Sequence, residues 1–238
     1  MILALNTSTA QFSMALMEED GNLAAEFFMV SKSRHFRPFM PVLHELLTTT
    51  KVSLGEIKAL AVAKGPGSFT GLRVGLSAAK GLCQGLSVPI VGVSSLEAMA
   101  NQLPFAAHPV CAILDSRKAE VFAALFRWSN DRGMVRLTED LCVKMVDLAS
   151  VTEERAIYLG NNRATQGPAI CEILGDRAFL APPSLWHLRA SVVGRLGLKQ
   201  AQAQGFDKLE DLVPSYLRPP DIRPNPHQPL SEKEDGNA

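Results

Sequence analysis

The spacing of hydrophobic residues changes along the first hundred residues, and each change marks a predicted element. Short apolar or alternating runs are typical of strands, whereas apolar positions three and four apart predict helices. Asp20-Gly21-Asn22 is a strong hairpin signal between two of these runs. We therefore expect strands at 2–6, 11–18, 22–30, 57–63 and 88–93, and helices at 34–49, 69–86 and 94–102.

The second half repeats this order weakly after the proline-flanked residues 104–109. A hairpin is predicted around Asp115, followed by more strands and two helices. The expected elements are strands at 110–114, 121–126, 133–137 and 156–159, and helices at 163–174 and 185–204. This predicts an α/β protein with lobes at 1–105 and 106–218, in which the last helix packs back on the first lobe. The proline-rich residues 219–238 hold too few apolar side chains to order themselves, so a disordered tail is predicted.

Two of the predicted helices have a broader apolar surface than packing against one sheet would bury. The helix at 69–86 has an apolar seam and, beside it, a second stripe that is mostly small. The seam is Phe69, Leu72, Leu76, Ala79, Cys83 and Leu86, and the second stripe is Gly71, Gly75, Ala78, Leu82 and Gly85. The segment 34–48 has a similarly broad apolar face. We expect both helices to contact a partner; the alternative is a helix buried between its own sheet and the second lobe.

The glycine-rich residues 65–71 lie between a predicted strand and the helix at 69–86. Such a loop aims backbone N–H groups at an anion. It lacks the Gly-Lys-Ser/Thr ending of a P-loop and the spacing of a dinucleotide fingerprint. Two interpretations of this loop remain open, an anion-binding site and a tight turn that allows close packing.

The composition of the chain limits the class of protein to which it can belong. The chain has 238 residues, is 47% hydrophobic and 20% charged, and has zero formal net charge, which is typical of an ordinary globular protein. No basic excess indicates direct nucleic-acid binding. The start of the chain does not resemble a signal peptide, no run is long enough to span a membrane, and the cysteines are too far apart for a zinc site. We expect a cytoplasmic protein whose cysteines are buried free thiols.

Several motifs resemble the TsaB (YeaZ) family. The most specific is Gly65-Pro-Gly-Ser-Phe-Thr-Gly-Leu-Arg73, and the match extends from Ile2 to about Arg218. Further segments that resemble the family are 2–9, 79–82, 89–98 and Pro214-Ser-Tyr-Leu-Arg218. The resemblance implies the duplicated actin-like fold of the sugar-kinase and heat-shock-ATPase superfamily, with two lobes and mixed sheets.

The resemblance also implies a function in making threonylcarbamoyladenosine, the modified base beside the anticodon of tRNAs that read codons starting with A. In that pathway TsaC makes threonylcarbamoyl-adenylate, TsaD transfers the group, TsaB binds TsaD, and the ATPase TsaE completes the assembly. It implies a non-catalytic subunit that forms a heterodimer with TsaD and a homodimer when alone, and that meets tRNA only through the complex. No cofactor is expected, apart from a nucleotide at the partner interface.

Site residues follow from the helices and the resemblance. The expected partner interface is Phe36, Phe39, Met40, Leu43, Phe69, Leu72, Arg73, Gly75, Leu76 and Lys80. A vestigial nucleotide site is expected at Asn6, Thr7, Ser8, Thr9, Gly65 and Gly67.

Departures from the family patterns argue against catalysis. TsaD-type enzymes hold a metal with two histidines one helical turn apart, and Ser95 and Met99 stand at those positions. Asn6 replaces an Asp usual in the first turn, which weakens its attraction for Mg²⁺. His35-Phe36-Arg37 departs from the usual His-Ser-Glu, and the other histidines stand alone. No metal is therefore expected.

Two catalytic alternatives stay open beside the subunit hypothesis. One is an ATP-dependent phosphotransferase or ATPase of the same superfamily, and the other is a metallopeptidase-type hydrolase. The charged turn Asp115, Arg117, Lys118 and Glu120 is interpreted as a structural hairpin with salt bridges. No serine lies in a nucleophile elbow.

Overall fold

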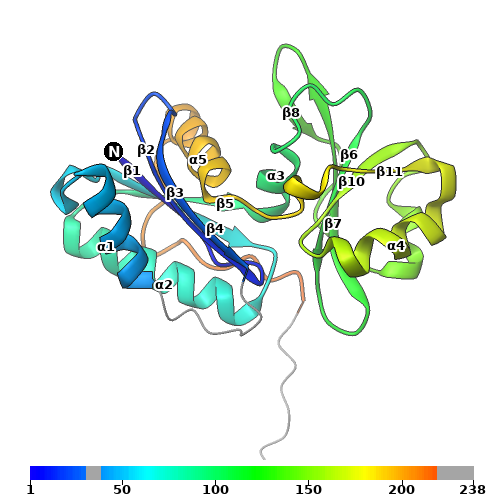
Figure 1. Cartoon of the computed structure of the whole chain (residues 1–238), viewed down its shortest axis with the longest axis horizontal. Coiled ribbons are helices and arrows are strands. Elements are labelled where there is room, and N and C mark those ends of the chain that lie inside the picture. The colour runs from blue at the N-terminus through cyan, green and yellow to red at the C-terminus, as the bar shows by residue number, and fades with distance from the viewer. Residues whose placement is uncertain (31–38, 219–238) are drawn as a thin grey trace, which may run out of the picture.

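The first lobe is built on a mixed five-stranded sheet. The computed structural model describes residues 1–30 and 39–218, and Figure 1 shows the two lobes side by side. The strand order is β3-β2-β1-β4-β5, in which β1, β2 and β3 are antiparallel and β4 and β5 run parallel to β1. The strands are β1 (Ile2–Asn6), β2 (Gln11–Met17), β3 (Leu23–Val30), β4 (Ala59–Gly65) and β5 (Ile90–Ser94).

Helices cover both faces of this sheet, which explains why β1 and β2 are apolar at nearly every position. Leu3 and Leu5 belong to a core with α1 (Phe39–Thr50) and α2 (Phe69–Leu86). Ala4, which points to the opposite face, packs instead toward α5 (Ala190–Gln204). The predicted helix at 69–86 is confirmed at both ends, where Ser68 accepts a hydrogen bond from the Gly71 N–H and Ser87 closes the helix in a left-handed conformation.

The second lobe repeats the topology of the first. Its six-stranded sheet has the order β11-β10-β6-β7-β8, with β9 paired to β7. The first strand, β6, is central in the same way as β1, with an antiparallel hairpin on one side and parallel strands on the other. The strands are β6 (Val110–Asp115), β7 (Glu120–Ser129), β8 (Gly133–Arg136), β9 (Leu141–Lys144), β10 (Ala156–Leu159) and β11 (Ala178–Leu180). The repeated order confirms the predicted duplicated actin-like fold.

The remaining helices are short, apart from α4, which lies on the second lobe (Figure 1). They are α3 (Ser95–Ala100), α4 (Arg163–Leu174) and the 3₁₀ turns Leu54–Glu56, Met145–Ser150, Gly175–Arg177 and Pro183–Leu185. The helix expected at 185–204 begins only at Ala190, because the proline-initiated turn comes first. Strands β9 and β11 were not predicted. None of the helices in the described ranges combines the length and the apolarity needed to cross a membrane.

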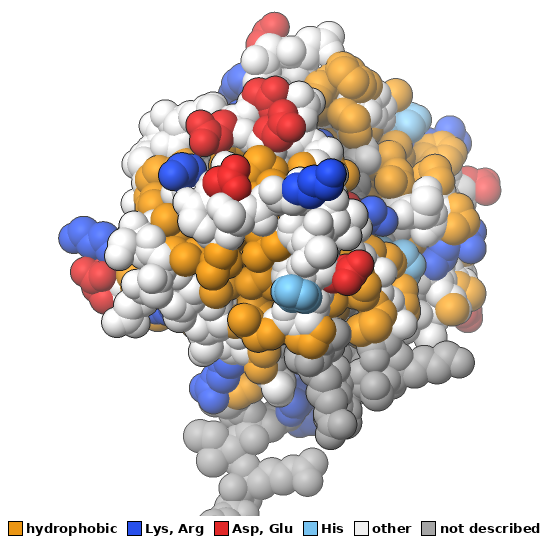
Figure 2. All heavy atoms as spheres, turned by 60° about the vertical axis from the view of Figure 1, so that its left-hand side comes forward, with side chains coloured by type: hydrophobic (Ala, Val, Ile, Leu, Met, Phe, Trp, Pro, Cys, Tyr) orange, Lys and Arg blue, Asp and Glu red, His pale blue; other side chains and the backbone are white. Residues whose placement is uncertain are grey.

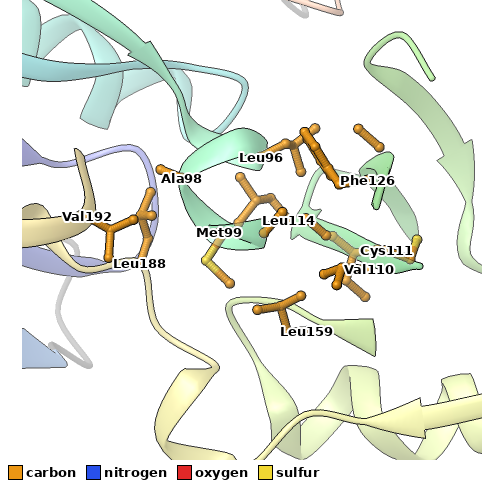
Figure 3. Close-up of a cluster of buried hydrophobic side chains, with 14 of the residues drawn as sticks. Leu96, Ala98, Met99, Val110, Cys111, Leu114, Phe126, Leu159, Leu188 and Val192 are labelled. Carbon is orange, nitrogen blue, oxygen red and sulfur yellow. The ribbon is translucent and has the colours of Figure 1, made fainter. Parts of the chain in front are cut away.

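One hydrophobic core joins the two lobes. Leu96, Ala98 and Met99 of α3 lie between the Leu188–Val192 segment and the β6–β10 region of the second lobe (Figure 3). This segment includes the start of α5, which packs on the first sheet (Figure 1). The boundary near residue 105 stays a prediction, since the chain crosses between the lobes more than once.

Two of the four cysteines differ from the prediction. Cys83 and Cys111 are buried free thiols, and burial raises the pKa of Cys83 to about 11. Cys142 and Cys171 are also free but exposed, because they lie on the outer sides of β9 and α4. The expectation that all four are buried was therefore wrong.

Candidate functional site: the first turn, α2 and the junction of the lobes

The first turn, residues 6–9, and the glycine loop are in contact. The Ser68 N–H donates to the Ser8 carbonyl at 2.7 Å. A Cβ on Gly67 would lie 2.2 Å from the same Ser8 oxygen, so only glycine permits this approach. The loop is thus a tight packing turn against the β1–β2 connection.

The polar side chains of the first turn bond within the protein. Asn6 is fully buried, donates from Nδ2 to the Leu188 carbonyl at 3.1 Å, and accepts from the Ser8 N–H and hydroxyl at 3.0 and 2.7 Å. The Thr7 hydroxyl donates to the Gly71 carbonyl at 2.7 Å, and Thr9 bonds to the Gln11 backbone. These groups hold the turn, and the vestigial nucleotide site stays a prediction.

Part of the predicted partner interface lies in the core of the first lobe, which is a correction. Leu72 is fully buried, and Leu43, Gly75 and Leu76 are buried too. Gly75 faces Thr7, since a Cβ there would meet Thr7 Oγ1 at 2.0 Å. The first part of the small stripe, Gly71 and Gly75, is therefore buried in the lobe, as in the alternative of a buried helix, whereas Gly85 at the end of the stripe is exposed. These four predicted interface residues are covered by the chain itself.

The outer sides of α1 and α2 nevertheless carry large apolar side chains. Met40 is 61% exposed and Val74 36% exposed. Phe39, Phe69 and Lys80 are half-buried and Arg73 is exposed, so these predicted interface residues are accessible. Together these six form what we call the α1–α2 surface, and Figure 2 shows hydrophobic side chains gathered on this side of the molecule. Phe36 and the His35-Phe36-Arg37 departure lie outside the described residues.

The two residues that stand where TsaD-type enzymes have metal-binding histidines are buried at the junction of the lobes. Ser95 and Met99 are fully buried, and Met99 points among Leu114, Leu159 and Leu188 in Figure 3. The Ser95 hydroxyl has no hydrogen-bond partner among residues 1–30 and 39–218. In the same part of the chain, no three His, Cys, Asp or Glu side chains are grouped to hold a metal. His44 is exposed, and His35 and His227 lie outside the described residues.

Sequence reasoning missed a polar cluster where the two lobes face each other. Gln11 donates to the Asn161 carbonyl at 2.7 Å across the junction, and Gln166 donates to Asp115 Oδ1 at 2.7 Å. Desolvation raises the pKa of the Asp115 carboxyl, while hydrogen bonds from Gln166, Asn161 and Asn162 oppose this. Gln11 and Asn161 are 150 residues apart, so no local signal could have paired them.

The charged hairpin turn forms an ion pair, but with a residue that the sequence did not indicate. Glu120 Oε2 lies 3.0 Å from Arg218 Nη1. Lys118 and Ala119 both have φ of 58°, which marks a tight turn. The pair connects the C-terminal segment to the second lobe, and its half-buried position fits a structural role.

Comparisons with known proteins agree with this geometry. The family described as "TsaD: tRNA N6-adenosine threonylcarbamoyltransferase" matches residues 29–213. The tRNA threonylcarbamoyladenosine biosynthesis protein TsaB of Bacillus subtilis is 31% identical over 91% of this chain and 93% of its own length. The Escherichia coli protein of the same name is 40% identical over 53% of this chain and 54% of its own.

A solved structure supports the fold over nearly the whole described chain. YeaZ from Pseudomonas aeruginosa superposes with a TM-score of 0.75 at 25% identity, covering 91% of this chain and 99% of that one. The repeated lobes, the glycine loop and these similarities over most of the chain lead to one conclusion. The chain belongs to the TsaB (YeaZ) family of tRNA threonylcarbamoyladenosine biosynthesis proteins.

Proposed function

We propose that this chain is a non-catalytic subunit that binds and positions TsaD for transfer of the threonylcarbamoyl group to tRNA. Family membership supports the coarser statement, a role in tRNA threonylcarbamoyladenosine biosynthesis. The target is the adenosine beside the anticodon of tRNAs that read codons starting with A. Such a role also implies a cytoplasmic location, which stays a prediction.

The observation that carries the binding role is the α1–α2 surface. Met40 is 61% exposed on α1 although the other side of the same helix is packed in the core. Exposed apolar side chains grouped on neighbouring helices favour a protein partner, because burying them removes apolar area from water. We propose that TsaD covers this surface, that TsaE joins the complex, and that tRNA is met only through it.

The lack of catalysis is proposed from the junction of the lobes. A metal site needs ligands that face an open space, but Ser95 and Met99 are fully buried, and Met99 belongs to the hydrophobic core (Figure 3). A nucleotide site needs free donors for phosphate, but Asn6 and Thr7 use theirs within the protein. Both features support an accessory subunit over the alternative of an ATP-dependent phosphotransferase.

One pair of variants tests the binding role. Met40→Asp places a charge on the α1–α2 surface, and Phe179→Asp makes the same kind of change at a 41% exposed position of β11 in the second lobe. We expect only Met40→Asp to lose capture of the TsaD protein from the same organism and to lose threonylcarbamoylation of tRNA in a reconstituted assay. Equal binding by both variants would place the interface elsewhere.

A separate assay tests the lack of catalysis. The isolated chain is incubated with ATP and Mg²⁺, and then again with TsaD and TsaE. We expect ATP turnover only in the mixture that also contains TsaD and TsaE. ATP turnover by the isolated chain that disappears in Thr7→Ala would support the phosphotransferase instead.

A further inference from the structure

The C-terminal segment 212–218 crosses from the first lobe to the second and is fixed at several points. Leu212 is 4% exposed and fills the space beside Gly92, where a Cβ would meet its Cδ1 at 2.4 Å. The Ser215 N–H donates to the Lys64 carbonyl at 2.7 Å, next to the glycine loop. Arg218 pairs with Glu120 of the second lobe at 3.0 Å. Tyr216 lies between these anchors, so its position is set by both lobes.

Tyr216 contacts the first turns of α2 through a cluster of three side chains. Its ring stacks on Phe69, with ring centroids 4.9 Å apart and an angle of 28°. Its hydroxyl oxygen accepts a hydrogen bond from Arg73 Nε at 3.0 Å. The Arg73 guanidinium carbon also lies 3.9 Å from the centre of the Phe69 ring. The guanidinium is therefore held by a cation–π contact and by one directed hydrogen bond.

This arrangement leaves the outer end of Arg73 available. Nε donates to Tyr216, and within residues 1–30 and 39–218 the two terminal amino groups form no ion pair with a carboxylate. Arg73 is exposed, and Tyr216 is 40% exposed beside it. A guanidinium whose plane is already fixed loses less side-chain freedom on binding, and its terminal N–H groups match the two oxygens of a carboxylate.

We propose that Arg73 binds a carboxylate of the TsaD partner and that Tyr216 is the positioning residue that orients it. The inference rests on the proposed function and extends the α1–α2 surface onto the C-terminal segment. Val74, the next residue, supplies apolar contact at 36% exposure, so Arg73 adds charge specificity beside an apolar patch. The contact between Arg73 and Tyr216 also brings together two segments that resemble the family, the one that ends in Arg73 and Pro214–Arg218.

The test is a titration of the full-length chain with TsaD from the same organism, at low and at high salt. Arg73→Ala is expected to weaken binding about tenfold or more and to reduce its salt dependence, because the variant lacks the ion pair. Tyr216→Phe keeps the ring stack and removes the hydroxyl, so we expect about three- to tenfold weaker binding with unchanged melting temperature. Arg73→Lys should not restore binding, since an ammonium lacks the planar pair of donors.

Matched controls make the result specific. Arg127→Ala removes an exposed arginine of the second lobe that pairs with Glu154 at 2.7 Å, and it should bind TsaD normally. Arg73→Gln replaces Arg73→Ala if the latter lowers the melting temperature. Arg73→Glu should regain binding with a TsaD variant in which one surface Asp or Glu is changed to Arg.

The outcomes separate this inference from the proposed function. If the wild-type chain does not bind TsaD at all, the proposed function fails and this inference fails with it. If the wild type binds but Arg73→Ala binds equally well with the same salt dependence, only the inference is overturned. If Arg73 matters only when ADP or ATP is added, the guanidinium contacts a phosphate, and the carboxylate assignment is likewise wrong.

Discussion

Gly75 of α2 lies directly against Thr7 of the first turn. A Cβ at Gly75 would be 2.0 Å from Thr7 Oγ1, and that hydroxyl donates to the Gly71 carbonyl one turn earlier. Gly75 thus lets the helix approach the β1–β2 turn, and the Gly71 carbonyl accepts the hydrogen bond from that turn. The stripe that suggested a partner in the sequence is at these positions a contact within the lobe.

The first prediction follows from this contact. Gly75→Ala forces Thr7 or the helix to move, and overpacking of this kind typically costs about 1–3 kcal/mol in the free energy of unfolding. Gly81→Ala is the matched control, because no heavy atom lies within 4 Å of a Cβ there. It should stabilise the protein by about 0.4–1 kcal/mol. Urea unfolding of both variants measures the difference.

A double variant makes this prediction sharper. Thr7→Ala removes the atom that the new Cβ would meet, so the Thr7→Ala/Gly75→Ala protein should lose less stability than the sum of the two single changes. Strict additivity would show that the two residues do not compete for the same space.

The second prediction compares neighbouring positions on opposite sides of α2. Leu72→Arg buries an unpaired charge at a fully buried site and should lower the free energy of unfolding by at least about 3 kcal/mol. Val74→Arg changes a 36% exposed site and should stay folded while losing TsaD binding. Circular dichroism and a pull-down on the same samples distinguish the two effects. A Leu72→Arg protein with an unchanged free energy of unfolding would contradict the packing described above.

The third prediction concerns Asn6. Its Nδ2 donates to the Leu188 carbonyl at 3.1 Å, so Asn6→Asp sets a carboxylate oxygen against that carbonyl in a fully buried site. We expect a loss of about 2–4 kcal/mol in the free energy of unfolding and no ATP turnover. Asn6→Asp that gains Mg²⁺-dependent ATP turnover would indicate an intact nucleotide site.

The fourth prediction is a pH dependence of stability. Burial lowers the pKa of His187, with a smaller contribution from Arg189, and its Nδ1 is buried without a partner among the described residues. The folded state therefore binds fewer protons at His187 than the unfolded state, so stability falls as the pH drops below about 6.5. His187→Gln should show a smaller difference between unfolding curves at about pH 7.5 and about pH 5.5. An unchanged difference would assign the pH dependence to other groups.

The fifth prediction concerns the free chain. An uncovered α1–α2 surface should self-associate with two-fold symmetry, giving a homodimer in the absence of TsaD. Light scattering should detect a dimer at tens of micromolar, and Met40→Asp should shift it toward monomer. A wild-type monomer at that concentration would contradict this. Added TsaD should convert the homodimer to a heterodimer, because both use the same surface.

Most elements could be predicted because their signals are local. The helix α2 has a capping serine, apolar spacing and a clear end, all within residues 68–87. β11 was not predicted because a strand of three residues is too short to show an alternating pattern. It is a strand because it pairs with β10. Of the residues predicted for the partner interface, Met40 and Arg73 are accessible, whereas Leu72 is buried, because apolar spacing alone does not show whether the apolar side of a helix packs on its own lobe or on a partner.

The sequence by itself determined the alternation of strands and helices, the family and the absence of histidines at Ser95 and Met99, since these depend on residue identity and neighbouring positions. The tertiary structure decided which side of α2 faces its own lobe, which carbonyl accepts the hydrogen bond from the Asn6 amide, and where Tyr216 lies. Asn6 meets Leu188 across 182 residues, and Arg73 meets Tyr216 across 143. Contacts at such separations form only when distant parts of the chain fold together, so they cannot be predicted from patterns of neighbouring residues.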